Sequence, residues 1–294
     1  FKMNYNLENK TIIVTGANSG IGKAAAIQLA ALGATVIMAC RTLERGEKAL
    51  EEVRGLSKSE NVVFMQLDMS SLASIRKFAE EFKTKHNRLD VLIHNAANFD
   101  HSLKKTSLTE DNIEKIFATN HVGIVLLTQL LLDLLKQSAP SRIITVASKG
   151  LTLFPSLDIE FDNLNGERKF STEHAYYHSK LSQVMFTYDL AEQLKNTGVT
   201  VNCVRVTNVA IPDERLTHLP AWQRSLYKLK RKMSITPERQ AETYVYLAAA
   251  PEVEKISGGY WDENNKQVNS SKNSYNKATW HKLREVTEKM AGIK

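Results

Sequence analysis

Short runs of apolar, β-branched residues alternate along this chain with longer segments whose apolar residues recur at helical spacing. The first run, TIIVT at 11–15, is followed by a glycine-rich turn and then by helical spacing over 21–32. This alternation predicts strands joined by helices. Further strands are predicted at 35–40, 62–67, 91–95, 142–148, 200–206 and briefly near Tyr260, and further helices at 43–53, 71–85, 113–137, 173–196, 237–250 and 279–290.

The predicted strands are almost continuously apolar, which is typical of a parallel sheet covered by helices on both faces. Right-handed crossovers then give a single doubly wound, Rossmann-type α/β sheet. We assign residues 1–294 to one domain because the alternation resumes after its one interruption, a polar and amphipathic segment at about 211–234. We interpret that segment as a helical lid insertion.

The lid segment mixes apolar and basic residues, LTHLPAWQRSLYKLKRKM at 216–233. Three interpretations stay open: a lid over the substrate, a patch that makes peripheral contact with a membrane surface, or a solvated helix whose apolar side packs on the core. A basic, amphipathic lid over an apolar pocket would suit a lipid-like carbonyl substrate.

A glycine cluster lies between the first predicted strand and the first predicted helix, where a backbone that turns sharply can approach an anion. The spacing is glycine, three residues, glycine, one residue, glycine, which differs from the standard dinucleotide fingerprint. A plain tight turn is the alternative, but the position between strand and helix favours a pyrophosphate site. The predicted cofactor contacts here are Gly16, Asn18, Ser19, Gly20, Ile21 and Gly22.

The end of the second predicted strand distinguishes between cofactors, because an acidic residue there would bind a ribose hydroxyl and repel a phosphate. This chain has Arg41 instead, which can offer a planar fork to a 2′-phosphate. NADP(H) is therefore favoured over NAD(H), with a surface arginine as the alternative. Lys23 and Arg45 either assist in binding or are exposed helix residues.

An acidic residue follows the third predicted strand. Asp68 is placed to accept a hydrogen bond from an adenine amino group, or else to cap the helix that starts near Ser71. Both interpretations stay open. Met69 adjoins it and is counted with it among the cofactor contacts.

Tyr176 and Lys180 are four residues apart in a helical segment, so they share one face of that helix. A phenol is a poor base at neutral pH, but a nearby ammonium group favours its phenolate and lowers its pKa. Such a tyrosine could give a proton to a ketone or take one from an alcohol. A tyrosine and a lysine at this spacing are common in helices. The position of this pair on the helix after the fifth predicted strand is what favours a catalytic role.

Two polar residues complete this group. Ser148 ends the fifth predicted strand, at the edge where ligands bind in open α/β sheets, and could hydrogen-bond the substrate oxygen. Asn120 lies within a long apolar helix, where its amide needs a partner. That partner is either a water relay to Lys180 or another core group.

Five ordered motifs resemble the short-chain dehydrogenase/reductase family: TGANSGIG at 15–22, Asn95-Ala96-Ala97, Asn120, Ser148 and YYHSK at 176–180. The resemblance extends over nearly the whole chain. Three further segments, ACRTLERGEKA at 39–49, TNHVG at 119–123 and YLAAAPEVEKISGGYW at 246–261, look like the retinol-dehydrogenase-like branch. That branch implies a lipophilic aldehyde, ketone or alcohol as substrate.

The resemblance implies a role for each residue of the tetrad. Tyr176 is the acid/base, Lys180 lowers its pKa and holds the nicotinamide ribose, Ser148 orients the carbonyl and Asn120 supports the proton relay. Tyr177 competes with Tyr176 but precedes Lys180 by only three residues. The resemblance also places Asn95 and Ala96 among the cofactor contacts.

Three positions depart from the family pattern. His94 and Ala97 stand where Asn and Gly are usual, and Val206-Thr207 replaces the Pro-Gly after the sixth strand. That loop normally wraps the nicotinamide, and Val209 could still present its backbone to the carboxamide. The tetrad is unaffected, so hydride transfer between NADP(H) and a carbonyl/alcohol pair is the predicted function. An NADP(H)-binding sensor with little turnover is the alternative.

Composition and charge narrow the remaining classes of function and location. A formal net charge of +7 indicates either affinity for an anionic partner or a solvated basic surface, and no nucleic-acid recognition motif appears. Cys40 and Cys203 lie in apolar runs, and neither they nor the eight histidines have metal-ligand spacing. No stretch approaches a membrane span of about 20 apolar residues and no secretory signal opens the chain. We expect no metal, a cytoplasmic location or one on the cytosolic side of a membrane, and a family resemblance compatible with a homodimer or homotetramer.

Overall fold

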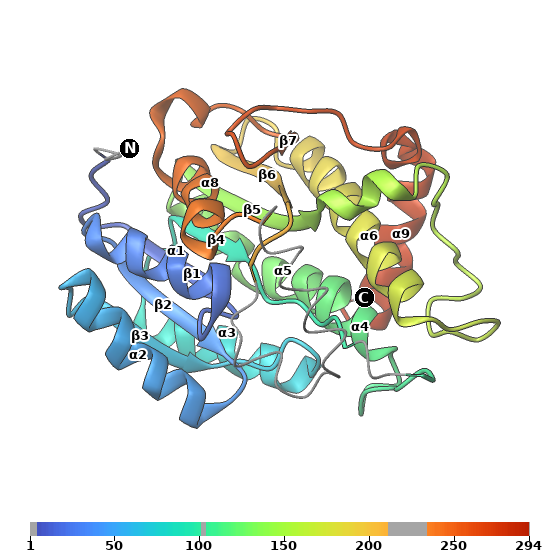
Figure 1. Ribbon diagram of the computed structural model, residues 1–294, viewed down its shortest axis with the longest axis horizontal. Coiled ribbons are helices and arrows are strands. Elements are labelled where there is room, and N and C mark those ends of the chain that lie inside the picture. Colours follow the sequence, from blue (N-terminus) through green and yellow to red (C-terminus); the bar gives the residue numbers. More distant parts are fainter. Residues whose placement is uncertain (1–4, 101–103, 211–233, 294) are drawn as a thin grey trace.

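The computed structural model describes residues 5–100, 104–210 and 234–293. Its centre is a seven-stranded parallel sheet with strand order β3-β2-β1-β4-β5-β6-β7 (Figure 1). The predicted doubly wound α/β fold is confirmed, because the order reverses direction at β1. The strands are β1 Thr11–Thr15, β2 Thr35–Cys40, β3 Val62–Gln66, β4 Val91–His94, β5 Ser141–Ser148, β6 Val199–Val206 and β7 Gly259–Trp261.

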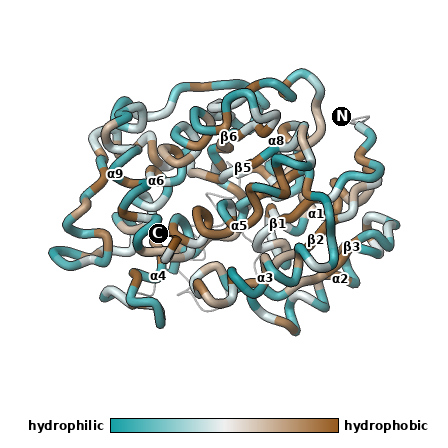
Figure 2. Tube along the Cα trace, turned by 180° about the vertical axis from the view of Figure 1, so that it is seen from behind, coloured by the Kyte–Doolittle hydropathy of each residue, from teal (hydrophilic) through white to brown (hydrophobic). Residues whose placement is uncertain are grey.

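Helices cover both faces of this sheet, and each face has its own hydrophobic core. Helices α1, α2 and α8 pack on one face, and α3, α5, α6 and α9 pack on the other. Figure 2 shows hydrophobic residues concentrated along α5 in the interior and hydrophilic residues on the outer connections. The helices are α1 Gly20–Ala31, α2 Leu43–Ser57, α3 Leu72–Lys85, α4 Lys115–Phe117, α5 Gly123–Gln137, α6 Thr172–Gln193, α8 Pro237–Ala249 and α9 Lys277–Met290.

The predicted helix over 113–137 is interrupted in the structure. It begins at Lys115 and passes through a π-helical turn, Ala118–Val122, before it continues as α5. In this turn the amide of Gly123 donates to the carbonyl of Ala118, five residues back. Such turns are short and shift the hydrogen-bond register of a helix, and they occur often at functional sites. Apolar periodicity continues through the turn, which is why the sequence pattern alone predicts one helix.

Within the described residues, one helical stretch, Lys115–Gln137, is long and apolar enough to cross a membrane, and 72% of its most apolar window is buried inside the protein. This burial agrees with a helix of the protein core.

The C-terminal helix covers the outer side of α6. On α9, the Thr287 hydroxyl lies 2.9 Å from His121 Nε2 and the Arg284 guanidinium lies 3.0 Å from the carboxylate of Asp189. Burial of Trp280 and Leu283 on the same helix face adds an apolar contact. The helix that carries Tyr176 and Lys180 is thereby enclosed from the sheet side and from outside. The predicted lid at about 211–234 lies, except for its last residue, outside the described residues.

Candidate functional site

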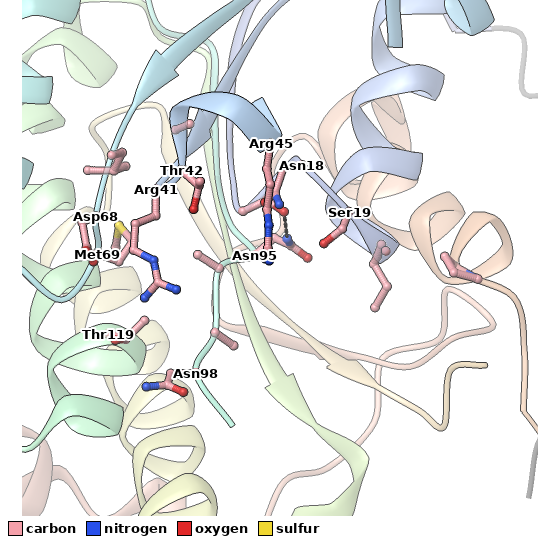
Figure 3. Close-up of a pocket in the computed structure, with 18 of the residues that line it drawn as sticks. Asn18, Ser19, Arg41, Thr42, Arg45, Asp68, Met69, Asn95, Asn98 and Thr119 are labelled. Carbon is pink, nitrogen blue, oxygen red and sulfur yellow. Dashed lines mark hydrogen bonds between the residues drawn. The ribbon is translucent and has the colours of Figure 1, made fainter. Parts of the chain in front are cut away.

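A cleft of about 480 Å³ opens at the carboxyl ends of the strands, where the sheet order reverses (Figure 3). This is the expected ligand position in an open α/β sheet. Most of the predicted cofactor contacts line it, namely Gly16, Asn18, Ser19, Gly20, Ile21, Arg41, Asp68, Met69, Asn95, Ala96 and Val209. Gly22, Tyr176 and Lys180 are not part of this lining.

Two glycines shape the wall of the cleft. Gly16 has a φ of +67°, and a Cβ there would lie 2.9 Å from the Cα of Ala96. A Cβ on Gly22 would lie 2.3 Å from Asn95 Nδ2 and 2.6 Å from the carbonyl oxygen of Gly16. Only glycine therefore lets the β1–α1 turn pack against the end of β4 and leave the cleft clear. The turn fits a pyrophosphate, because it brings backbone amides and the start of α1 to one wall.

Asn95 ties three elements together behind the glycine turn. Its Nδ2 donates to the carbonyls of Thr15 (2.9 Å) and Gly16 (3.3 Å). Its Oδ1 accepts from the hydroxyl of Tyr244, a fully buried residue of α8, at 3.2 Å. The amide of Ala96 donates to the hydroxyl of Thr15 at 2.9 Å. Asn95 thus holds the wall of the cleft, a positional role that the sequence motif did not reveal.

Two arginines extend into the cleft beyond β2. Arg41 and Arg45 are exposed and both line the opening (Figure 3). Within the described residues neither guanidinium has an ion-pair partner. Lys23 differs, since its ammonium group pairs with Glu52 of α2 at 2.6 Å and does not line the cleft. Arg45 is therefore the better placed of the two residues that the sequence left open.

Asp68 lines the cleft and also organises the turn that follows it. Its Oδ1 accepts from the amide (2.9 Å) and the hydroxyl (2.7 Å) of Ser70. The N-terminal cap of α3 is Ser71, whose hydroxyl accepts from the amide of Ser74. The helix is thus capped without Asp68.

The loop after β6 has a defined course despite its lack of the usual Pro-Gly. The amide of Thr207 donates to Oε1 of Gln240 on α8 at 3.1 Å. Val209 then pairs with Ile235 as a short parallel bridge, and both sides of this bridge are hydrogen-bonded through the backbone. Val209 is consequently held in a position where it lines the cleft.

The chemical end of the site lies between β5 and α6. Ser148, at the end of β5, lies close enough to Tyr176, in the first turns of α6, for its hydroxyl to lower the pKa of the phenol. Lys180 lies one turn farther on, with its Nζ 5.6 Å from the centre of the Tyr176 ring. The ammonium group donates to the carbonyl of Val146 at 2.7 Å. The structure therefore brings these three predicted residues together.

Ionisation at this end differs from the sequence-based expectation. Burial raises the pKa of Tyr176 to about 12, and the Ser148 hydrogen bond opposes this effect only in part. Burial lowers the pKa of Lys180 to about 8. The expected lowering of the phenol pKa is not present, because the ammonium group is directed at Val146 rather than at the phenol oxygen. The phenol is consequently protonated at neutral pH in the cofactor-free protein.

Asn120 lies in the π-helical turn and is fully buried. Its Oδ1 accepts from the amide of Asn98 (2.6 Å), and its Nδ2 donates to the carbonyl of Asn98 and to the hydroxyl of Ser179, each at 3.0 Å. Ser179 in turn donates to the carbonyl of Tyr176 at 2.6 Å. The Asn120 side chain therefore fixes the loop after β4 against the start of α6, and its backbone carbonyl is directed at another residue of that helix.

That carbonyl accepts a hydrogen bond from the side chain of Gln183, a residue that the sequence reasoning missed. Gln183 is fully buried one turn beyond Lys180 on α6. The available signal was the spacing, because a residue three positions after Lys180 lies on the same face of a helix.

Aromatic rings surround the phenol. Phe99 stacks on Tyr176 with ring centres 4.0 Å apart, and Tyr177 meets Tyr176 edge-on at 5.3 Å. Phe154 lies 4.6 Å from the ring of Tyr177. We call these four residues the aromatic wall. The competing candidate Tyr177 therefore belongs to the same wall, with its ring against Gly150.

The departure at His94 has a structural explanation. The ring is fully buried in β4, and its Nε2 lies 2.8 Å from the hydroxyl of Thr128 on α5. Burial lowers the pKa of His94 to about 3, so the imidazole is neutral at physiological pH. His94 therefore occupies a core position in β4 and does not line the cleft.

Comparisons with known proteins agree with this geometry. Residues 10–156 match the family described as short chain dehydrogenase. Retinol dehydrogenase 14 of Homo sapiens is 39% identical over 98% of this chain and 88% of that protein, and retinol dehydrogenase 13 of Homo sapiens is 40% identical over 87% and 77%. A short chain dehydrogenase from Shigella flexneri 2a, complexed with NADP, superimposes with a TM-score of 0.69 at 21% identity over 89% of this chain and 99% of that chain. This chain belongs to the short-chain dehydrogenase family and is an oxidoreductase with the retinol-dehydrogenase-like character that its motifs indicate.

Proposed function

We propose that this protein transfers a hydride between NADP(H) and a lipophilic carbonyl/alcohol pair, and that reduction is its working direction. The observation that carries the proposal is the group Ser148, Tyr176 and Lys180 at the carboxyl end of β5, beside the nucleotide cleft. NADPH supplies the hydride when bound. The protein has to orient the carbonyl and protonate its oxygen.

The ionisation of Tyr176 supports the direction of reduction. A phenol whose pKa is raised to about 12 is protonated at neutral pH and is ready to donate. Ser148 holds the phenol and can also hydrogen-bond the carbonyl oxygen. Lys180 supplies a positive charge as the phenolate forms, and Asn120 fixes the loop and helix that bring the groups together.

The preference for NADP(H) is supported by the charge at the end of β2. Arg41 and Arg45 extend into the cleft, where an acidic residue would instead favour a free ribose hydroxyl. A guanidinium group binds phosphate through paired hydrogen bonds. The Shigella flexneri neighbour was determined with NADP. We propose the remaining cleft residues as cofactor contacts, with Asp68 and Met69 at the adenine and Val209 at the nicotinamide.

The substrate class is supported by the aromatic wall. Phe99, Tyr177 and Phe154 place apolar ring surface beside the reactive phenol, and such surface favours a hydrophobic ligand. The names of the relatives point to a retinoid-like alcohol or aldehyde. A lipophilic aldehyde or ketone is therefore the substrate that we propose.

We also propose a cellular location, a domain organisation and an oligomeric state for the enzyme. Cys40 and Cys203 are both free and buried, which suits the cytoplasm or the cytosolic side of a membrane. Strands from both ends of the chain share one sheet, which supports a single domain. A homodimer or homotetramer and peripheral membrane contact remain predictions.

The test is the pair of variants Tyr176→Phe and Tyr177→Phe, assayed by NADPH consumption with a panel of aldehydes and ketones that includes retinal. Tyr176→Phe should lower kcat by about a thousandfold or more, because the proton donor is lost. Its affinity for NADPH, measured by fluorescence, should stay within about threefold of the wild type, since the phenol lies outside the cleft lining.

Tyr177→Phe is the matched control and should retain most of the turnover. Full activity in Tyr176→Phe would refute the assignment. NADPH binding without consumption of any carbonyl by the wild-type protein would instead favour the sensor hypothesis.

A further inference from the structure

We propose that Gln183 is a positioning residue for Lys180, whose carboxamide connects the ammonium group to the backbone carbonyl of Asn120 and helps to keep that group charged. The catalytic meaning of this inference rests on the proposed function, because Lys180 matters to turnover through Tyr176. The hydrogen-bonded bridge through Gln183 is a feature of the protein without cofactor, so it can be tested independently of turnover.

The orientation of the Gln183 amide follows from its two partners. Its Nε2 donates to the carbonyl oxygen of Asn120, which can only accept. Its Oε1 then faces the ammonium group of Lys180, which can only donate, at 3.5 Å. The side chain is fully buried, so no solvent competes for either end. The reversed amide would place like groups together at both contacts.

The π-helical turn makes this bridge possible. It shifts the hydrogen-bond register around Asn120, as the bond from Gly123 to Ala118 shows. The side chain of Asn120 is engaged with Asn98 and Ser179, and its backbone carbonyl accepts from Gln183 on α6. The bridge therefore links the turn after β4 to the helix that carries Tyr176.

The groups around Lys180 show why a neutral acceptor matters. The carbonyl of Val146 on β5 accepts from the ammonium group, and the Tyr176 ring lies beside it on α6. On β6, burial raises the pKa of Cys203 to about 11, so this thiol is neutral at pH 7. Within the described residues no carboxylate forms an ion pair with Lys180. The Cys203 thiol opposes the burial that lowers the pKa of Lys180, and the acceptors that the ammonium group contacts are neutral.

Two variants of nearly unchanged size should move the ionisation of Lys180 in opposite directions. Gln183→Met removes the acceptor and should lower the titration midpoint of Lys180 by about one pH unit, which is the effect of one lost hydrogen bond to a charged group. Gln183→Glu places a carboxylate beside the ammonium group and should raise it by about as much or more. The probe is the ¹³Cε chemical shift of Lys180 in lysine-labelled, cofactor-free protein, assigned by its loss in Lys180→Arg.

The matched control is Gln193→Met, on the same helix. The Gln193 side chain donates to Asp189 at 2.9 Å, on the side of α6 that faces α9. This variant should leave the Lys180 midpoint unchanged. Midpoints that stay at the wild-type value in both Gln183 variants, or that move in the same direction, would overturn the proposal.

A catalytic measurement completes the test. In Gln183→Met, kcat for reduction should fall by about twofold at pH 7 and by nearly tenfold at about pH 9, in proportion to the charged fraction of Lys180 at each pH. A shifted midpoint with unchanged kcat would show that Gln183 has no positioning role in turnover. If the wild-type protein reduces no carbonyl at all, the proposed function fails while the titration still decides whether the bridge exists.

Discussion

The two ends of the site are built from different parts of the structure. At the nucleotide end, the cleft is lined by backbone of the β1–α1 turn and by the exposed Arg41 and Arg45. At the chemical end, Asn120, Lys180 and Gln183 are almost completely buried, and each depends on the others for a hydrogen-bond partner or for its position. One end offers open contacts, whereas the other is a closed network.

This difference implies different consequences of mutation. A contact between an exposed side chain and a ligand is lost by itself, so its removal weakens binding and leaves the protein intact. A buried polar group that loses its partner retains the desolvation penalty and disturbs its neighbours. We therefore expect changes at the nucleotide end to affect cofactor affinity and changes at the chemical end to affect the rate and its pH dependence.

The largest effect at the nucleotide end should come from its backbone. Gly22→Ala places a Cβ 2.3 Å from Asn95 Nδ2 and 2.6 Å from the carbonyl oxygen of Gly16, so the turn has to move. The affinity for NADPH should fall by about a hundredfold, measured by fluorescence titration.

Gly55→Ala provides the control for this change, since a Cβ at that position meets nothing within 4 Å. It should leave NADPH binding unaltered and raise the thermal stability slightly, because alanine favours the helix. An affinity in Gly22→Ala equal to that of Gly55→Ala would mean that the turn does not hold the cofactor.

Arg41→Ala should change the selectivity of the nucleotide end between NADPH and NADH. Loss of a guanidinium–phosphate contact should weaken NADPH binding by about thirtyfold and leave NADH binding within about twofold. Arg45→Ala, measured in the same way, will decide whether the second arginine of the cleft contributes. Equal losses for the two nucleotides in Arg41→Ala would contradict a 2′-phosphate site.

The chemical end of the site should make the activity depend on pH. The ammonium form of Lys180 is present below its pKa of about 8 and is lost as the pH rises through that value. The phenol of Tyr176, with a pKa of about 12, stays protonated over the same range. We expect kcat/KM for NADPH, which reports ionisations of the free enzyme, to fall by about tenfold per pH unit above pH 8.

Lys180→Arg tests the origin of this decline, because a guanidinium group remains charged throughout. Its activity should be lower than that of the wild type, yet independent of pH between about 7 and 10. The same decline in both proteins would assign the titration to another group.

The sequence predicted the open end more completely than the closed end. The strand, glycine turn and helix over 11–32 are contiguous, so spacing alone determines which groups meet. Tyr176 and Lys180 share a helix face for the same reason. The bridge through Gln183 depends on the π-helical turn, which interrupts a continuous apolar pattern and was not predicted.

Ionisation was also beyond what the sequence could establish. A lysine four residues from a tyrosine indicates a lowered phenol pKa only if the ammonium group faces the oxygen. Here the carbonyl of Val146 attracts the ammonium group, and Phe99 covers the phenol ring. Both groups come from other strands or loops, so burial determines the direction of the shift.

The smallest effect that we expect is at Asp68, which organises its own turn and which we propose also contacts the adenine. Its Oδ1 is bonded to Ser70, so Asp68→Asn can keep the turn while it loses the charge and one acceptor. NADPH binding should weaken by only about threefold, the loss of one exposed hydrogen bond. The decisive comparison uses the cofactor analogue with hypoxanthine in place of adenine, which has no amino group to donate. Wild-type protein should bind this analogue about threefold less tightly than NADPH, whereas Asp68→Asn should bind both alike. An equal preference for adenine in the two proteins would show that Asp68 serves the turn alone, and that even the open end of the site contains a residue whose role is set by its own chain.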